Sequence, residues 1–222
     1  MTLTGGSFNL IQVPMLNAHE ALERLREGNR RFVAHQTTTP QFPQGNLVEG
    51  QEPFAIIFGC SDSRVPAELV FDQGFGDLFV IRVAGNIIAP SLVGSVEFAA
   101  SRFNTPLVVV MGHTQCGAIL ATLDDLRGHA RPESRNLRAI IDRIRPALET
   151  LVTSGASLDE DAFLHQAVRA NVRHAVDHLR HGSDLLERLI DESGLRIVAA
   201  EYSLETGHVD FFDGGPKEHG DK

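Results

Sequence analysis

Two short segments of the sequence combine residue types that could do chemistry together. The segment C-S-D-S-R supplies Cys60, Asp62 and Arg64. The segment H-T-Q-C supplies His113 and Cys116, the second of the two cysteines in the chain. Two thiolates and an imidazole form a soft nitrogen and sulfur ligand set, which suits zinc. Three protein ligands leave a fourth position for water, as in catalytic zinc sites, so these residues predict a catalytic zinc centre.

Two other interpretations of the cysteines are open. Unpaired cysteines often pack simply as small buried apolar side chains. Cys60 and Cys116 could also form a disulfide, although a reducing compartment favours a metal or catalytic role. A disulfide would leave the neighbouring histidine, aspartate and arginine without an explanation, so the metal site is the preferred interpretation.

Both segments follow short apolar runs that the sequence predicts to be strands. The predicted strands are 54–58, 78–83, 107–111 and 197–200, and the predicted helices are 18–32, 91–103, 115–127, 136–152, 160–180 and 183–193. Short apolar strands that alternate with helices predict an α/β fold, in which a central, mostly parallel sheet has helices on both faces. The alternating segment 208–212 could add an antiparallel edge strand. Ligands bind outside the carboxyl ends of the strands in such sheets, so the two segments should converge there.

The chain is expected to have three parts. Residues 1–35 form an N-terminal arm and a helix, which begins at Asn17 with a capping box to Glu20. Residues 36–213 form the zinc-binding α/β domain, which starts with a loop rich in Pro, Thr and Gln. Residues 214–222 form a polar tail.

Composition limits the classes of partner. The chain has 222 residues, 42% hydrophobic and 22% charged, which is enough for one α/β domain with a sizeable core. A net charge of −9 argues against a nucleic acid or an anionic membrane as partner. No apolar run is long enough to span a bilayer. The first residues, MTLTGGSFNL, lack the features of a secretory signal, so a cytoplasmic location is expected.

The two segments resemble the signature of the β-class carbonic anhydrases. That signature is C-x-D-x-R followed by H-x-x-C, and here it reads C-S-D-S-R-V and H-T-Q-C-G. The resemblance implies reversible hydration of carbon dioxide to bicarbonate and a proton by zinc-bound hydroxide, with one zinc per subunit held by Cys60, His113 and Cys116. It also implies a homodimer or higher homo-oligomer with active sites at the interface. The N-terminal arm and helix are then expected to pack on the partner subunit.

Asp62 and Arg64 are the candidate catalytic residues. Two thiolates and a neutral imidazole cancel the charge of zinc, so its water should ionise less readily than with three imidazoles. Asp62 can accept a hydrogen bond from zinc-bound water or hydroxide and orient it for attack. Arg64 can hold that carboxylate by charge-assisted hydrogen bonds and keep it ionised. The resemblance also implies a closed form, in which Asp62 leaves Arg64, becomes the fourth zinc ligand and expels the water.

Other site residues are implied by the resemblance alone. Gln51 matches a glutamine that hydrogen-bonds bicarbonate in the constitutively open subgroup; the other interpretation is a polar residue of a turn. Ile57 stands where the subgroup that binds inhibitory bicarbonate has tryptophan, which also favours an open site. The apolar substrate pocket maps onto Phe79, Ala84, Phe98 and Gly117. An apolar wall suits carbon dioxide, and ordinary core packing is the other interpretation of the pocket side chains.

Two further functions fit the same residues. Ala84 is smaller than the usual valine, and Phe98 lacks the hydroxyl of the usual tyrosine. These two differences make a carbonyl sulfide or carbon disulfide hydrolase on the same scaffold the second possible function. A non-enzymatic, zinc-stabilised bicarbonate sensor is the third possibility. Such a sensor should have lost the pair of Asp62 and Arg64, and the sequence retains it.

Overall fold

The computed structural model describes residues 16–38, 47–154 and 159–214 of the chain. Most of the expected N-terminal arm, part of the loop predicted at 36–50, and the polar tail after residue 214 lie outside the described residues. The described part contains one five-stranded sheet and the helices around it.

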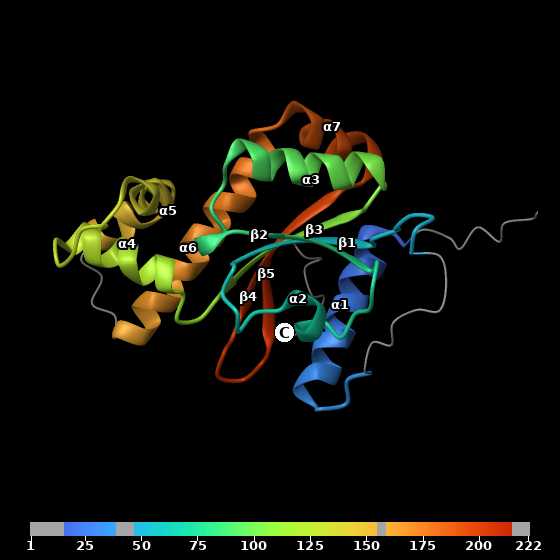
Figure 1. Ribbon diagram of the computed structural model, residues 1–222, viewed down its shortest axis with the longest axis horizontal. Coiled ribbons are helices and arrows are strands. Elements are labelled where there is room, and N and C mark those ends of the chain that lie inside the picture. Colours follow the sequence, from blue (N-terminus) through green and yellow to red (C-terminus); the bar gives the residue numbers. More distant parts are fainter. Residues whose placement is uncertain (1–15, 39–46, 155–158, 215–222) are drawn as a thin grey trace, which may run out of the picture.

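The sheet has the strand order β2-β1-β3-β4-β5 (Figure 1). The strands are β1 (Ala55–Gly59), β2 (Leu78–Arg82), β3 (Leu107–His113), β4 (Arg196–Tyr202) and β5 (Val209–Asp213). The first four pair in parallel, and β5 pairs with β4 in antiparallel fashion. Strands β1 and β3 are buried along their whole length, as expected for strands covered on both faces. The predicted fold class and the antiparallel edge strand are confirmed.

Helices cover both faces of this sheet (Figure 1). They are α1 (Ala18–Val33), α2 (Ala67–Val70), α3 (Pro90–Arg102), α4 (Gly117–Arg127), α5 (Arg135–Thr153), α6 (Glu160–His181) and α7 (Asp184–Ser193). α1 and α2 pack on one face, whereas α3, α7 and the C-terminal half of α6 pack on the other. Among the described helices, none combines the length and the apolar character needed to cross a membrane.

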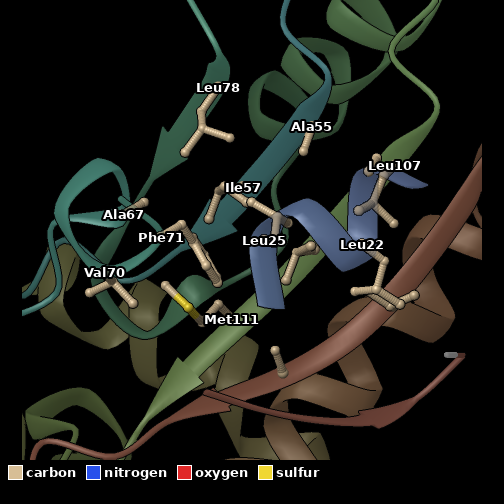
Figure 2. Close-up of a cluster of buried hydrophobic side chains, with 14 of the residues drawn as sticks. Leu22, Leu25, Ala55, Ile57, Ala67, Val70, Phe71, Leu78, Leu107 and Met111 are labelled. Atoms are coloured by element: carbon tan, nitrogen blue, oxygen red, sulfur yellow. The ribbon is translucent and has the colours of Figure 1, made fainter. Parts of the chain in front are cut away.

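The core on the first face is built from apolar side chains of the sheet, α1 and α2. Figure 2 shows Leu22 and Leu25 of α1 and Val70 of α2 packed around Ile57 and Met111 of the sheet. The apolar residues of α1 recur at helical spacing, so one side of the helix is buried. The helix begins as predicted: the Asn17 side chain accepts from the Glu20 backbone at 3.0 Å, and the Glu20 carboxylate accepts from the Asn17 backbone at 2.8 Å.

A third core cluster lies where α4, α5 and the N-terminal half of α6 meet. It contains both cysteines, Cys60 and Cys116, together with apolar residues such as Ile144 of α5 and Val168 of α6. The predicted metal site is therefore embedded in a core, and the helices that follow β3 form its wall.

Two one-turn elements were not predicted, and two strands, β3 and β4, are longer than predicted. The unpredicted elements are the four-residue helix α2 and the 3-10 turn η1 (Ala84–Asn86). A single turn has too few residues to show a helical period in the sequence. Strand β3 continues beyond residue 111 because Gly112 and His113 pair with Glu201 and Tyr202 of β4.

Ion pairs of Asp125 hold helix α4 against α5. Its side chain is 6% exposed and pairs with Arg138 at 2.9 Å and also with Arg145. Hydrogen bonding from Arg138 lowers the pKa of Asp125 from its ordinary value. A lowered folded-state pKa means that the pair stabilises the fold above the unfolded pKa and stops doing so as the pH falls through the folded pKa. This cluster therefore links the stability of the α4–α5 wall to pH.

Asp125→Asn is expected to lower the Tm by several degrees at neutral pH, because one carboxylate no longer neutralises two arginines. The difference from wild type should shrink below about pH 4, where the unfolded carboxyl group takes up its proton. Calorimetric melting over a pH series measures this effect, with the exposed neighbour exchange Asp124→Asn as the control. A Tm difference that does not vary with pH would contradict the role of the carboxylate charge.

Candidate metal centre

Parallel pairing of β1 and β3 brings the two predicted segments together. Gly59 of β1 pairs with Met111 of β3, so Cys60, the next residue, lies level with Gly112 and beside His113. After β1 the chain crosses through α2 on one face, and after β3 it crosses through α6 on the other. Adjacent strands whose connections leave toward opposite faces open a crevice at their carboxyl ends, where ligands bind in such sheets.

The turn between β3 and α4 directs Cys116 back to this crevice. Gln115 adopts a left-handed conformation with φ of 55°, which reverses the chain after His113. Cys116 is the N-cap residue of α4, where the positive end of the helix dipole favours a thiolate. Both cysteines are free thiols, and the ligand atoms of Cys60, His113 and Cys116 all lie within 4.8 Å of one another.

The histidine is oriented for metal binding. His113 is fully buried, and its Nδ1 lies 2.9 Å from the Thr114 carbonyl oxygen, so Nδ1 donates and the proton is held there. This leaves Nε2 with a free lone pair, and Nε2 is buried without a hydrogen-bond partner. A buried polar atom without a partner is costly unless something binds it. The donor set of one imidazole and two sulfurs around this atom fits a zinc ion.

The pKa values of the three ligand residues indicate that the crevice favours positive charge. A hydrogen bond from Cys116 outweighs burial and lowers the pKa of Cys60 to about 4. The same bond and burial raise the pKa of Cys116. Burial alone would lower the pKa of His113, but the charge of the nearby Cys60 thiolate and the Thr114 carbonyl raise it. A thiolate thus persists at neutral pH in a buried place that attracts a cation.

An aspartate and an arginine lie at the rim of the crevice. Arg64 donates from Nε to Asp62 Oδ1 at 2.9 Å and from a terminal nitrogen to Oδ2 at 2.7 Å. The same Oδ2 is 3.9 Å from His113 Nε2, so the carboxylate faces the three ligands. The hydrogen bonds from Arg64 hold the pKa of Asp62 well below its usual range. Asp62 therefore stays an anion and a hydrogen-bond acceptor over the whole neutral range.

Arg82 and Gly85 support the site, and neither was predicted from the sequence. Arg82 of β2 donates from Nε to the Cys60 carbonyl at 2.9 Å and from a terminal nitrogen to the Asp62 carbonyl. It thereby fixes the loop that carries Asp62. Gly85 donates its backbone N–H to Cys60 Sγ at 3.4 Å. Neither residue belongs to the two segments. The pairing of β1 with β2 brings Arg82 close to the site, and the turn η1 that follows β2 brings Gly85 there.

The expected substrate-binding residues divide into two groups. Ala84 begins η1, next to Gly85, and Gly117 begins α4, next to Cys116, so both adjoin the metal ligands. A Cβ added to Gly117 would meet no atom within 4 Å, so open space lies beside it.

The second group lies away from the ligands of its own chain. Gln51 is exposed and precedes the amino end of β1, while Cys60 follows the carboxyl end, and each strand residue between them adds about 3.3 Å. Phe79 pairs with Ile56, near the start of β1. Phe98 of α3 is 53% exposed, and its ring packs against Phe79 in a tilted arrangement and against Phe103 edge to face, at centroid distances of 6.4 and 5.7 Å.

Comparison with known proteins identifies the class that this fold and site define. The carbonic anhydrase family model matches residues 55–209. The chain is 38% identical over 204 residues to carbonic anhydrase 2 of Mycobacterium tuberculosis H37Rv, covering 89% of this chain and 94% of that protein. It is also 38% identical to a carbonic anhydrase of Mycolicibacterium smegmatis, covering 89% and 95%.

A solved structure agrees with these relatives. The crystal structure of the β-carbonic anhydrase CafA of Aspergillus fumigatus superposes with a TM-score of 0.68 at 27% identity, covering 78% of this chain and 81% of that one. The Cys-His-Cys cluster is typical of the zinc-binding sites of this class. The chain belongs to the β-class carbonic anhydrase family, whose enzymes catalyse the reversible hydration of carbon dioxide, and it is an enzyme of this kind.

Proposed function

We propose that the chain carries out this hydration with one zinc ion per subunit, held by Cys60 Sγ, His113 Nε2 and Cys116 Sγ. The observation that carries the proposal is the buried, unpartnered Nε2 of His113, which faces two sulfurs within 4.8 Å. When bound, zinc supplies a Lewis acid that makes water nucleophilic near neutral pH.

Asp62 is proposed to orient the nucleophile. Its Oδ2 is within 3.9 Å of His113 Nε2, and its low pKa keeps it an acceptor. A carboxylate that accepts the hydrogen of the attacking oxygen directs the oxygen lone pair at the carbon of the substrate. Arg64 is proposed to hold Asp62 in this position, because its two nitrogens and its backbone N–H all donate to the carboxylate.

The same pairing supports the open form of the site. Both carboxylate oxygens of Asp62 are engaged by Arg64, and Arg64 is also within 3.4 Å of the Gln115 carbonyl oxygen. A closed form with Asp62 as a fourth metal ligand would have to give up these bonds. The same bonds lower the pKa of Asp62 and so keep it as the anion that pairs with Arg64.

We further propose that the working unit is a homodimer or a higher homo-oligomer, whose subunits complete one another's substrate pockets. Ala84 and Gly117 would line the pocket from the same chain, beside the metal ligands. Gln51, Phe79 and Phe98 would come from the partner, which agrees with the distance of Gln51 from Cys60 along β1 and with the exposed aromatic ring of Phe98.

The position of α1 limits which part of the N-terminal region can contact the partner subunit. Leu22 and Leu25 pack on the sheet of the same chain, so α1 shares its core with the α/β region. A contact with the partner subunit is therefore proposed for the outward side of α1 and for the arm before it. The division of the chain into residues 1–35 and 36–213 is therefore proposed only in the sense that the first part contacts the partner subunit.

Mixing two inactive chains tests the shared pocket. Gln51→Ala and Asp62→Ala homo-oligomers are each expected to be strongly impaired, because each lacks one part of every site. After co-refolding, a mixed dimer has one site with Asp62 from one chain and Gln51 from the other. We expect the mixture to recover roughly a quarter of wild-type activity for random pairing of dimers, because half of the pairs are mixed and each restores one of two sites. Stopped-flow hydration of carbon dioxide measures the recovery.

If Gln51 acts within its own chain, co-refolding restores nothing, and that result would refute the shared pocket. The function itself is tested by the same assay on protein stripped with a chelator. Hydration should vanish with the zinc and return when one equivalent is added. Hydration that persists without metal would refute the proposed zinc chemistry.

A further inference from the structure

A buried side chain outside the proposed mechanism reaches the metal site from α6. Asn171 is 3% exposed, and its amide nitrogen donates a hydrogen bond to the Gly85 carbonyl oxygen at 2.9 Å. The backbone N–H of Gly85 in turn donates to Cys60 Sγ at 3.4 Å. Helix α6 is thus connected to a metal-ligating sulfur through one glycine.

Gly85 adopts a left-handed conformation, with φ of 68° and ψ of 18°, which glycine tolerates readily. The following Asn86 is also left-handed, with a φ of 41°, and this conformation costs free energy for a residue other than glycine. The space is also tight, since a Cβ on Gly85 would lie 2.7 Å from Ile144 Cδ1 and 2.9 Å from Ala118 Cβ. The strained conformation of Asn86 persists only where its surroundings hold it, and the Gly85 carbonyl belongs to the peptide that joins the two residues. The bond from Asn171 is such a restraint, placed on the carbonyl of Gly85.

The hydrogen bond from Gly85 bears on the chemistry of the Cys60 sulfur. A thiolate that accepts an N–H hydrogen bond gives less charge to its metal ion, and such outer contacts tune metal centres. Two thiolates cancel the charge of zinc and weaken it as an acid toward water. A fixed N–H on one of them offsets part of that weakening.

We propose that Asn171 is a positioning residue of the metal centre. By holding the Gly85 carbonyl it restrains the backbone torsions of Gly85, keeps the Gly85 N–H directed at Cys60 Sγ, and so sets the donor strength of that thiolate. The inference rests on the proposed zinc site, and it assigns to α6 a role in the reaction besides packing.

Cobalt(II) in place of zinc, in the full chain, provides the test, because its sulfur-to-metal charge-transfer absorption reports the electron density on the thiolates. Asn171→Leu keeps the approximate size of the side chain and removes the donor. We expect this absorption to move to longer wavelength, because the thiolate regains electron density. We expect zinc affinity to fall about 10-fold, because the loosened turn at Gly85 no longer positions Cys60 well. Asn171→Ser, whose side chain is too short for the Gly85 carbonyl, should act in the same direction and serves if the leucine variant fails to fold.

Asn29→Leu is the matched control. Asn29 is also buried, at 4% exposed, and its amide donates to the Val70 and Gly207 carbonyls, on the α1 side of the sheet. This exchange should lower the Tm and leave both the absorption and zinc affinity unchanged.

The possible outcomes distinguish a failure of the proposed zinc site from a failure of the role of Asn171. Wild-type protein without any sulfur-to-cobalt absorption would overturn the zinc site and the role of Asn171 together. A normal wild-type absorption, with folded Asn171 variants that match it in wavelength and zinc affinity, would overturn only the role of Asn171. Equal changes in Asn29→Leu would also overturn that role, because they would trace the effect to general destabilisation.

Discussion

The His113→Ala variant is expected to lose both its bound zinc and its activity. It removes the only imidazole of the buried ligand set and leaves two thiolates that cannot complete the site. Loss of a partner outside the ligand shell costs metal sites about 10- to 100-fold in affinity, so loss of a direct ligand should cost more. Zinc content after dialysis, measured by atomic emission together with stopped-flow hydration, gives both quantities on one sample. Cys60→Ser should behave in the same way.

His178→Ala is the control for this experiment, because His178 lies on an exposed part of α6 and outside the site. It should keep its zinc and its rate. Full zinc occupancy in both His113→Ala and Cys60→Ser would contradict the assignment of the ligands, even if the rates fell.

Asp62→Ala is expected to keep its metal and lose most of its activity. The carboxylate is not one of the three ligands in the open form, so zinc affinity should change little. Loss of a positioned acceptor for the proton of the nucleophile should reduce kcat/KM by about 100-fold. Metal content and carbon dioxide hydration at neutral pH together measure this separation of binding from catalysis.

Asp77→Ala is a matched control, because Asp77 also forms an ion pair with an arginine. Its Oδ1 accepts from Arg24 at 2.7 Å, at the amino edge of β2 and away from the crevice. It should cost some stability and leave the rate unchanged. An undiminished rate in Asp62→Ala at neutral pH would rule out the orienting role of Asp62.

The ligand set could be predicted from the sequence because each part of it is local. Cys60 and His113 directly follow or end apolar strands, and neighbouring parallel strands bring their carboxyl ends to the same edge. The strands were recognisable because β1 and β3 are buried on both faces and so form continuous apolar runs. Residue type and strand position together were therefore enough to expect the cluster.

The supporting residues could not be predicted, because their roles depend on contacts that are distant in sequence. Asn171 lies in the middle of a long helix, where a polar residue in the sequence usually indicates a solvated side. Arg82 ends a strand and would be taken for a surface charge. The left-handed turn at Gly85 depends on contacts with α4, α5 and α6 that form only in the folded chain.

X-ray absorption at the zinc edge of the purified enzyme tests the central claim most directly. The account predicts one zinc per chain, with two sulfur ligands at about 2.3 Å, one imidazole nitrogen near 2.0 Å and one light fourth ligand. A shell with no sulfur, or a protein whose Cys60 and Cys116 are joined in a disulfide while it is active, would contradict it.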